Sequence, residues 1–129
     1  MEKIGKQEMN NPKRGEVWLV KLDPTRGQEI KKTRPAIVIS SNIFRSVSVK
    51  IIVPIAKWQS KFQNRLFMIS IPKTDENGLD NDSAGNVLQV RSIANERFVR
   101  CLGRVSNSIL EELLAGLIIC IDYQYDSLI

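Results

Sequence analysis

The stretch "GEVWLVKLDPTRGQEIKKTRPAIVIS", residues 15–40, contains two short apolar runs joined by a polar loop. Both runs are rich in β-branched and aromatic residues, and both are bounded by Gly or Pro, so each predicts a β-strand. Four further runs of the same kind follow: "SVSVKIIVPIA" (46–56), "RLFMISIP" (65–72), "NVLQVRS" (86–92) and "VRCLGRVS" (99–106). Short strands at close spacing predict a small barrel or sandwich rather than a parallel sheet.

The one strong helix signal is "SNSILEELLAGLIICIDYQ", residues 106–124. Ser108 and Glu111 fit a capping box at its start. Apolar residues at helical spacing form a broad face, which suits core packing and also leaves room for a dimer contact. These residues are Ile109, Leu110, Leu113, Leu114, Leu117, Ile118 and Ile121. A shorter segment, "SIANERF" (92–98), predicts one or two helical turns.

The predicted fold is therefore α+β and mainly β, a small barrel with a short helix and a C-terminal amphipathic helix. At 129 residues and 43% apolar composition, the chain is long enough for one domain with its own core. We place this domain at residues 14–123, after a polar flexible arm (1–13) and before a short tail (124–129).

The composition also restricts function. A net charge of +5 and a pI near 9.4 favour an anionic partner such as nucleic acid, an acidic protein or a membrane surface. No apolar run is long enough to span a membrane and no secretion signal is present, so a cytoplasmic location is expected. In that setting Cys101 and Cys120 are expected to be buried, reduced thiols.

The chain contains no histidine. This excludes histidine-pair ribonuclease chemistry, Ser-His-Asp hydrolysis and nearly every zinc site with nitrogen ligands. Catalysis here would have to use Arg, Lys, carboxylates, hydroxyls or backbone groups, and we expect neither a metal nor another cofactor.

The loop before the second strand is unusually basic. Arg26, Lys31, Lys32 and Arg34 fall within nine positions. Pro35 favours an extended backbone at Arg34, where the loop becomes a strand, so this guanidinium is suitably placed to bind a phosphate through two parallel hydrogen bonds. A surface arginine paired with Glu29 is the simpler alternative.

Three segments together resemble the PemK/MazF family of toxins from toxin–antitoxin pairs: "RGEVWLVKLDPTRGQEIKKTRPAIVIS", "IIVPIAKWQ" and "NDSAGNVLQVRSIANERFVRCLGRVS". The resemblance implies an SH3-like β-barrel with appended helices and a two-fold homodimer. It also implies metal-independent, sequence-specific cleavage of single-stranded RNA that leaves a 2′,3′-cyclic phosphate and a 5′-hydroxyl. A cognate acidic antitoxin that folds onto the basic groove would be the protein partner.

Site residues follow from the same resemblance. It gives Arg34 the catalytic role, for which charge stabilisation is the safer function because arginine is a poor base. Glu29 would hold a cation or accept a proton. The RNA-binding positions that the resemblance and the residue chemistry indicate are Gly27, Gln28, Lys31, Lys32, Trp58, Gln89 and Arg91.

Several of these positions have two interpretations. Trp58 either stacks on an RNA base or seals the barrel end. Gln89 and Arg91 alternate along one predicted strand, which is either an RNA-facing surface or an ordinary exposed face. The pair Asp82-Ser83 fits a turn cap better than a catalytic pair.

The chain departs from the family pattern at Ala56, where many members have a threonine that works with the arginine. Ser40, Ser41 and Ser60 are candidate replacements for its hydroxyl. The departure motivates an alternative function, a catalytically impaired protein that binds RNA or antitoxin. A second alternative is inhibition of a protein target such as DNA gyrase, as the related barrel toxin CcdB does.

Overall fold

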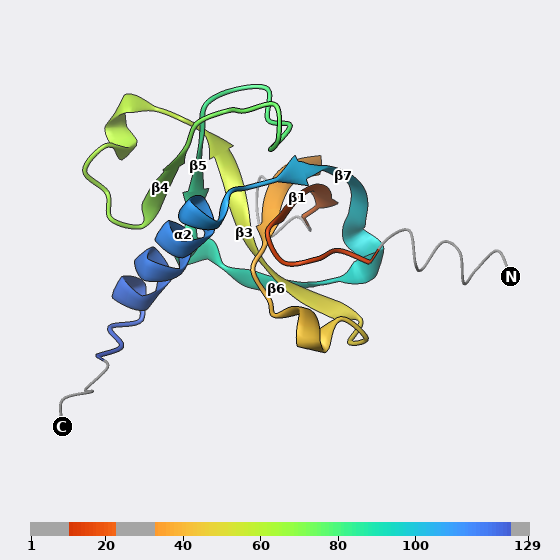
Figure 1. Ribbon diagram of the computed structural model, residues 1–129. Coiled ribbons are helices and arrows are strands. Elements are labelled where there is room, and N and C mark those ends of the chain that lie inside the picture. The colour runs from red at the N-terminus through yellow and green to blue at the C-terminus, as the bar shows by residue number, and fades with distance from the viewer. Residues whose placement is uncertain (1–10, 23–32, 125–129) are drawn as a thin grey trace, which may run out of the picture.

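The structure is a computed structural model that describes residues 11–22 and 33–124. Its main feature is a curved antiparallel sheet (Figure 1). The strands are β1 (Glu16–Lys21), β2 (Thr33–Val38), β3 (Val49–Lys57), β4 (Met68–Ile71), β5 (Ser83–Asn86), β6 (Arg91–Ala94) and β7 (Phe98–Arg104). One α-helix, α2 (Asn107–Cys120), follows them, and single 3-10 turns lie at Asn42–Phe44, Ser60–Phe62, Val87–Gln89 and Asn95–Arg97.

The strand order is β4-β5-β3-β2-β1-β7, and β6 pairs with the first half of β3. β3 is the longest strand and joins the two parts of the sheet, because its second half pairs with β5. Among the described strands no ladder joins β7 to β4. The mainly β, α+β class is confirmed, with the predicted barrel present as a curved but open sheet.

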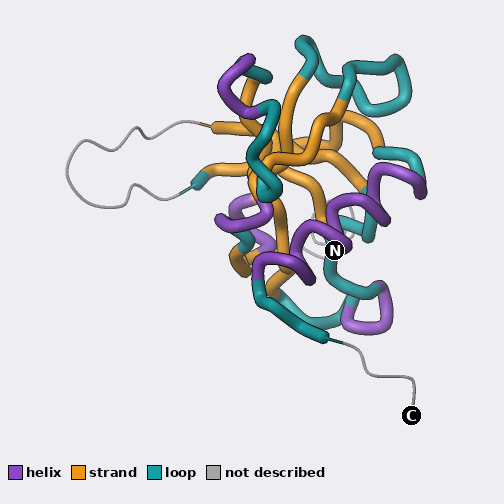
Figure 2. The backbone as a smooth tube through the Cα atoms, turned by 90° about the vertical axis from the view of Figure 1, so that its left-hand side faces the viewer, coloured by secondary structure: helices purple, strands orange, loops and turns teal. Residues whose placement is uncertain are grey.

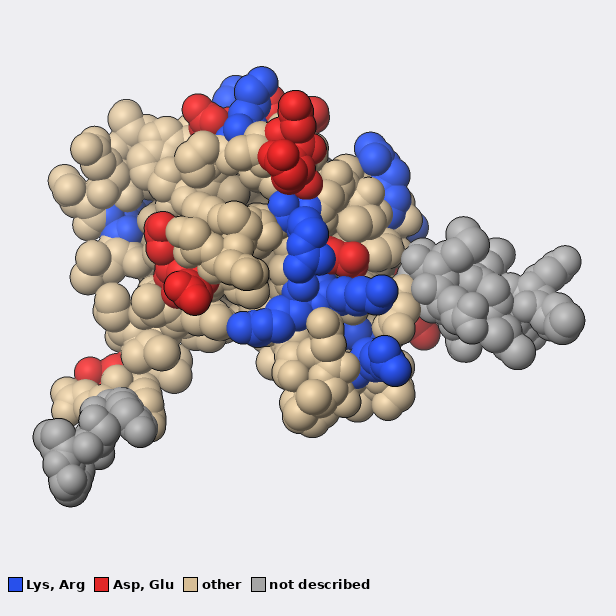
Figure 3. All heavy atoms as spheres, in the orientation of Figure 1, with Lys and Arg blue, Asp and Glu red and all other residues tan. Residues whose placement is uncertain are grey.

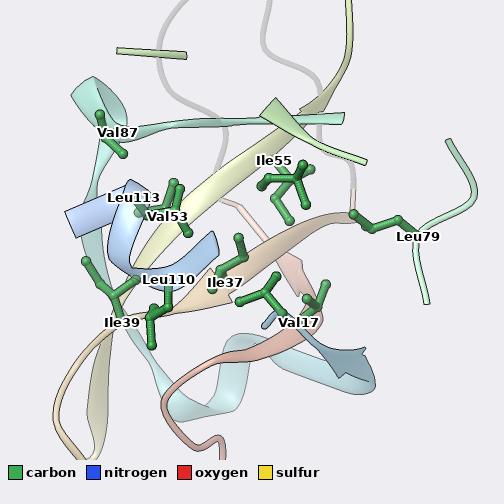
Figure 4. Close-up of a cluster of buried hydrophobic side chains, with 11 residues drawn as sticks. Val17, Ile37, Ile39, Val53, Ile55, Leu79, Val87, Leu110 and Leu113 are labelled. Carbon is green, nitrogen blue, oxygen red and sulfur yellow. The ribbon is translucent and has the colours of Figure 1, made fainter. Parts of the chain in front are cut away.

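Both faces of the central strands are buried, which explains why their sequences are nearly continuous apolar runs instead of alternating ones. Val17, Ile37 and Val53 lie side by side across β1, β2 and β3 and belong to the core cluster under α2 (Figure 4). Their neighbours Trp18 and Ala36 face the other way, into a second cluster with Phe98.

Helix α2 covers one side of the sheet near β4 and the turn Val87–Gln89 (Figures 1 and 2). Leu110 and Leu113 are buried in the core, whereas Ile118 and Ile121 are 44% and 63% exposed. Gly116 permits the close approach, because a Cβ there would lie 2.9 Å from Cδ1 of Ile69. The first half of the predicted apolar face therefore packs in the core, and its last turn remains on the surface.

The helix start differs from the prediction. Its N-cap is Ser106, whose hydroxyl accepts a hydrogen bond from the amide of Ile109 at 3.2 Å, so the capping box at Ser108 and Glu111 was wrong. The cause is tertiary. Val105 is buried and its amide donates to the carbonyl of Gly15 at 2.9 Å, which fixes the chain just before the helix.

A buried lysine fixes the other end of the molecule. Lys50 on β3 is 3% exposed, and its ammonium donates to the carbonyl of Val47 at 2.8 Å and to Oδ1 of Asn95 at 3.2 Å. Burial lowers the pKa of Lys50 from its ordinary value. The lysine thereby links the turn before β3 to the 3-10 turn after β6.

One smaller expectation is corrected. Cys101 and Cys120 are free thiols, as predicted, but Cys101 is exposed on β7 and Cys120 is only partly buried near the helix end. Pro12, two residues before the expected start of the domain at residue 14, is fully buried.

Candidate functional site

A pocket of about 540 Å³ lies at one end of the sheet, where β2 begins and β3 ends. The loop before β5 forms another of its walls. Its lining residues are Leu19, Arg34, Pro35, Ile55, Ala56, Lys57, Gly78, Leu79, Asp80, Asn81, Ser83, Arg100 and Leu102. The sequence segments "TRPAIV", "VKIIVPIAK" and "GLDNDS" thus meet in space, although 39 residues separate the first from the last.

The backbone of Arg34 is held by strand pairing with β1. It is the second residue of β2, it pairs with Val20 of β1, and its side chain is exposed. On the other side, Ala36 pairs with Pro54, so continuing that register by two residues brings Arg34 level with Ala56. A guanidinium at the rigid start of a strand is preorganised to bind an anion in the pocket.

Ala56 lies across from Ala84 of β5, which is fully buried. The methyl group offers the pocket no hydroxyl at this position. Two of the suggested replacements are committed elsewhere, because Ser40 accepts a hydrogen bond from the amide of Ile51 and Ser41 caps the turn Asn42–Phe44. Ser60, the third, does not line the pocket.

The hydroxyl that does line the pocket belongs to Ser83. Its side chain is 5% exposed and donates to the carbonyl of Asn81 at 2.7 Å, while Oδ1 of Asp82 accepts from the amide of Lys73 at 3.0 Å. The predicted turn-capping role of Asp82-Ser83 is confirmed by these bonds. Sequence reasoning did not predict that this loop also lines the pocket that contains Arg34. The loop reaches the pocket because β5, which follows it, pairs with the end of β3.

Charge is unevenly distributed along the chain. Residues 30–74 contain nine Lys and Arg and no Asp or Glu, whereas residues 75–82 contain four Asp and Glu and no Lys or Arg. Among the described residues that line the pocket, three cations (Arg34, Lys57 and Arg100) accompany one carboxylate (Asp80). On the face seen in Figure 3, Lys and Arg side chains form a continuous blue band near the centre, with red acidic groups at the top and at the sides.

Five of the predicted site residues lie outside the described part of the chain. They are Gly27, Gln28, Glu29, Lys31 and Lys32, and Arg26 lies there with them. They belong to the segment between Leu22 and Thr33, and Arg34 is the residue after Thr33.

Trp58 follows the last residue of β3 and packs edge-on against Phe62, with ring centroids 5.8 Å apart. Phe62 in turn packs with Met68 and Ala84 in a small cluster that Trp58 partly covers. Trp58 thus covers a small core cluster beside an open sheet. Its indole is only partly buried, and its base-stacking role stays a prediction.

The predicted strand over residues 86–92 is wrong. β5 ends at Asn86, Gln89 is the last residue of a 3-10 turn, and Arg91 starts β6. The side chain of Asn86 caps the turn by accepting from the amide of Leu88 at 3.1 Å, which ends the strand there. Gln89 and Arg91 therefore belong to different elements, and neither lines the pocket.

The described residues contain no group of three or more His, Cys, Asp or Glu side chains that could hold a metal ion. None of the helices within that part of the chain is long and apolar enough to cross a membrane.

The chain is similar in sequence to known proteins. Residues 13–121 match the model of a protein family described as "PemK-like, MazF-like toxin of type II toxin-antitoxin system". The chain belongs to this family. The match includes all seven strands and α2, and it confirms the resemblance that the sequence motifs indicated.

Two relatives support membership in the PemK/MazF-like family by sequence. Endoribonuclease MazF9 of Mycobacterium tuberculosis is 36% identical over 107 residues, which are 78% of this chain and 88% of the relative. Endoribonuclease PemK of Escherichia coli is 32% identical over 106 residues, which are 81% and 77% of the two chains.

Solved structures share the fold of this family member. An endoribonuclease in complex with its cognate antitoxin from a mycobacterial species superposes with a TM-score of 0.71 at 14% identity, covering 88% of this chain and 98% of that one. MazF from Deinococcus radiodurans, in its Form-I crystal structure, gives a TM-score of 0.71 at 18% identity, covering 87% and 97%.

Proposed function

We propose that this chain is an endoribonuclease toxin of a toxin–antitoxin pair, which cuts single-stranded RNA at a specific short sequence without a metal ion. The cleavage would leave a 2′,3′-cyclic phosphate and a 5′-hydroxyl. The observation that carries the proposal is the position of Arg34 in a pocket where cations outnumber carboxylates by three to one, in a chain of the PemK/MazF-like family. Both curated relatives described above are named endoribonucleases, which supports the reaction class.

The proposed reaction uses the RNA's own 2′-hydroxyl as the nucleophile. Its oxygen attacks the adjacent phosphorus, and negative charge accumulates on the phosphoryl oxygens in the transition state. A guanidinium that is permanently charged and fixed by strand pairing stabilises that charge without having to reorganise. Arg34 has this arrangement, and removal of a comparable electrostatic group costs other enzymes roughly 100- to 1,000-fold in rate.

The other cations of the pocket, Lys57 and Arg100, are suited to hold the phosphates on either side of the cut. The roles predicted for Gly27, Gln28, Lys31, Lys32, Trp58, Gln89 and Arg91 in binding RNA are part of this proposal. Glu29 is proposed to hold a cation of the site or to accept a proton.

The test is cleavage of a long unstructured RNA in excess chelator by wild type, Arg34→Ala and Arg45→Ala. Arg45 is the matched control, because it is exposed on the turn before β3 and does not line the pocket. We expect discrete fragments with 5′-hydroxyl ends from wild type and Arg45→Ala, and no cleavage by Arg34→Ala. Undiminished cleavage by Arg34→Ala would refute the mechanism, and cleavage that stops in chelator would refute metal independence.

A second candidate function follows from Ala56. Without a hydroxyl at this position the chain would bind RNA or antitoxin in the same pocket and cut RNA slowly or not at all. Tight binding of a labelled RNA by wild type, combined with the absence of fragments after long incubation, would favour this second function.

We also propose two protein partners and a cytoplasmic location. An acidic antitoxin is expected to occupy the cation-rich pocket, since one of the solved structures with this fold is described as a complex with a cognate antitoxin. A neighbour-encoded acidic chain that binds without blocking RNA would contradict this. The second partner is another copy of the chain, and a light-scattering mass of a single 14.7 kDa chain would contradict it.

A further inference from the structure

The proposed reaction needs a proton acceptor, and Glu29 lies outside the described residues. The 2′-hydroxyl must lose its proton as its oxygen attacks phosphorus, and Arg34 cannot accept it because a guanidinium stays protonated at any ordinary pH. Ala56 offers no group at all. The hydroxyl of Ser83 is a weak base, and its own hydrogen is already donated to the carbonyl of Asn81.

Asp80 is the only carboxylate among the described residues that line the pocket. The remaining side chains with polar groups there are cations, an amide and the Ser83 hydroxyl. A carboxylate can accept a proton without first losing one, unlike the cations of this set. Asp80 lines the same pocket as Arg34 and could supply what the arginine cannot.

The loop holds Asp80 firmly from its N-terminal side. Leu79, the preceding residue, is 8% exposed and belongs to the main core cluster. Asn77 is 3% exposed, and its Oδ1 accepts from the amides of Thr74 and Leu79, both at 3.0 Å, while its amide nitrogen donates to the carbonyl of Pro72 at 2.9 Å.

Gly78 presses this part of the loop against β7. Its φ is +67°, a conformation that favours glycine, and a Cβ at this position would lie only 2.1 Å from the carbonyl oxygen of Leu102. The backbone of the loop therefore lies directly against β7, a strand that also lines the pocket.

The loop is fixed on the C-terminal side as well. Oδ1 of Asp82 accepts from the amide of Lys73, and the carbonyl of Asp82 accepts from the amide of Trp58 at 2.9 Å. Within the described residues, the carboxylate of Asp80 makes no hydrogen bond or ion pair. Asp82 is thus used for structure, whereas Asp80 is presented to the pocket with its oxygens available on a rigid support.

We propose that Asp80 is a catalytic residue, the proton acceptor for the attacking 2′-hydroxyl, and this rests on the proposed function. The proton passes from the 2′-oxygen to the Asp80 carboxylate as the bond from the 2′-oxygen to phosphorus forms. The bond from phosphorus to the 5′-oxygen breaks, and the leaving oxygen keeps the electron pair and takes a proton from water. Arg34 stabilises the charge on the phosphoryl oxygens throughout.

The experiment compares wild type with Asp80→Asn, which keeps the shape of the side chain and removes its basicity. We expect the cleavage rate to fall by about 100-fold or more, the usual contribution of a general base. Binding of an uncleavable RNA, with a 2′-deoxy sugar at the cut site, should be unchanged or tighter, because the variant removes a negative charge from a phosphate-binding pocket. Slower cleavage with intact binding would separate chemistry from positioning.

Two variants serve as controls. Asp75→Asn removes a carboxylate from the same loop at an exposed position that does not line the pocket, so wild-type cleavage is expected. Glu29→Gln tests the other carboxylate considered for the role. A rate loss in Glu29→Gln with none in Asp80→Asn would overturn the assignment to Asp80.

The pH dependence provides a second readout. The pH–rate profiles of wild type and Asp80→Asn should differ in shape, because the variant removes the proposed proton acceptor. Wild type that cuts RNA, together with an Asp80→Asn variant that cuts equally fast, would reject this proposal alone. Wild type that leaves RNA intact under all conditions would reject the proposed function and this proposal with it.

Discussion

At the scale of single residues, the site depends on which side chain stands at position 56. Position 56 and Arg34 line the same pocket, and the residue opposite position 56 on β5 is alanine as well. A threonine at this position would add a hydroxyl to the pocket without disturbing the strand, because β-branched residues suit a pleated sheet.

We therefore predict that Ala56→Thr increases the cleavage rate by tenfold or more, measured as initial rates on the same RNA. Ala94→Thr is the matched control, since Ala94 is also a half-buried strand residue but lies on β6 and does not line the pocket. Equal rates for wild type and Ala56→Thr would show that the native site does not need the hydroxyl.

Sequence reasoning identified Arg34 and Ala56 but did not identify Asp80 or the second environment of Ser83. Arg34 and Ala56 lie in β2 and β3, whose apolar character is plain in the sequence. The loop residues enter the pocket through the pairing of β5 with the end of β3 and through the contact of Gly78 with β7. The segment "GLDNDS" does not by itself predict such long-range contacts. The concentration of Asp and Glu in residues 75–82 of a basic chain was the one sequence signal that could have marked this loop as a candidate part of the site.

At the scale of elements, the start of α2 shows how tertiary structure decides between two local signals. Ser106 and Ser108 are both chemically able to cap, and "SILE" matches a capping box better than "SNSI". The structure selects Ser106, because the buried strand residue Val105 fixes where the chain can turn into the helix.

Ser106→Ala should accordingly lower the free energy of unfolding by about 1 kcal/mol, the usual cost of losing an N-cap. Ser108→Ala is expected to change it by a few tenths of a kcal/mol at most, because that residue is exposed inside the first turn and alanine favours helices. Urea unfolding followed by far-ultraviolet circular dichroism measures both. A larger loss for Ser108→Ala would restore the capping box.

The strands were predicted well where both faces are buried and poorly where they are short. β1 lies within its predicted run, and β2 and β3 overlap theirs for most of their length, since continuous apolar sequence leaves few alternatives. β2 begins two residues early, at Thr33, and β3 ends one residue late, at Lys57. In residues 83–94 the chain instead forms two four-residue strands around a 3-10 turn. The amide of Leu88 donates to Oδ1 of Asn86, and this side-chain cap ends β5 at Asn86. The alternation of apolar and polar residues along this segment does not predict such a cap.

At the scale of the whole molecule, the separation of charge matters more than the net value of +5. Nine cations without a carboxylate over residues 30–74 include both Arg34 and Lys57, and Arg100 from β7 joins them at the pocket. A polyanion held by such a surface gains much of its affinity from the counterions that it releases.

The affinity for single-stranded RNA is therefore predicted to fall steeply with salt. Each phosphate contact contributes a slope of about −0.7 to the plot of log association constant against log salt concentration. Replacing both Lys57 and Arg100 by alanine should make the slope less negative by about 1.4, two such contacts, and should weaken binding similarly for all RNA sequences. Fluorescence anisotropy of an uncleavable RNA at several salt concentrations measures both quantities, with Arg45→Ala as the control outside the pocket. An affinity independent of salt, or a double variant with the wild-type slope, would show that RNA is held elsewhere on the molecule.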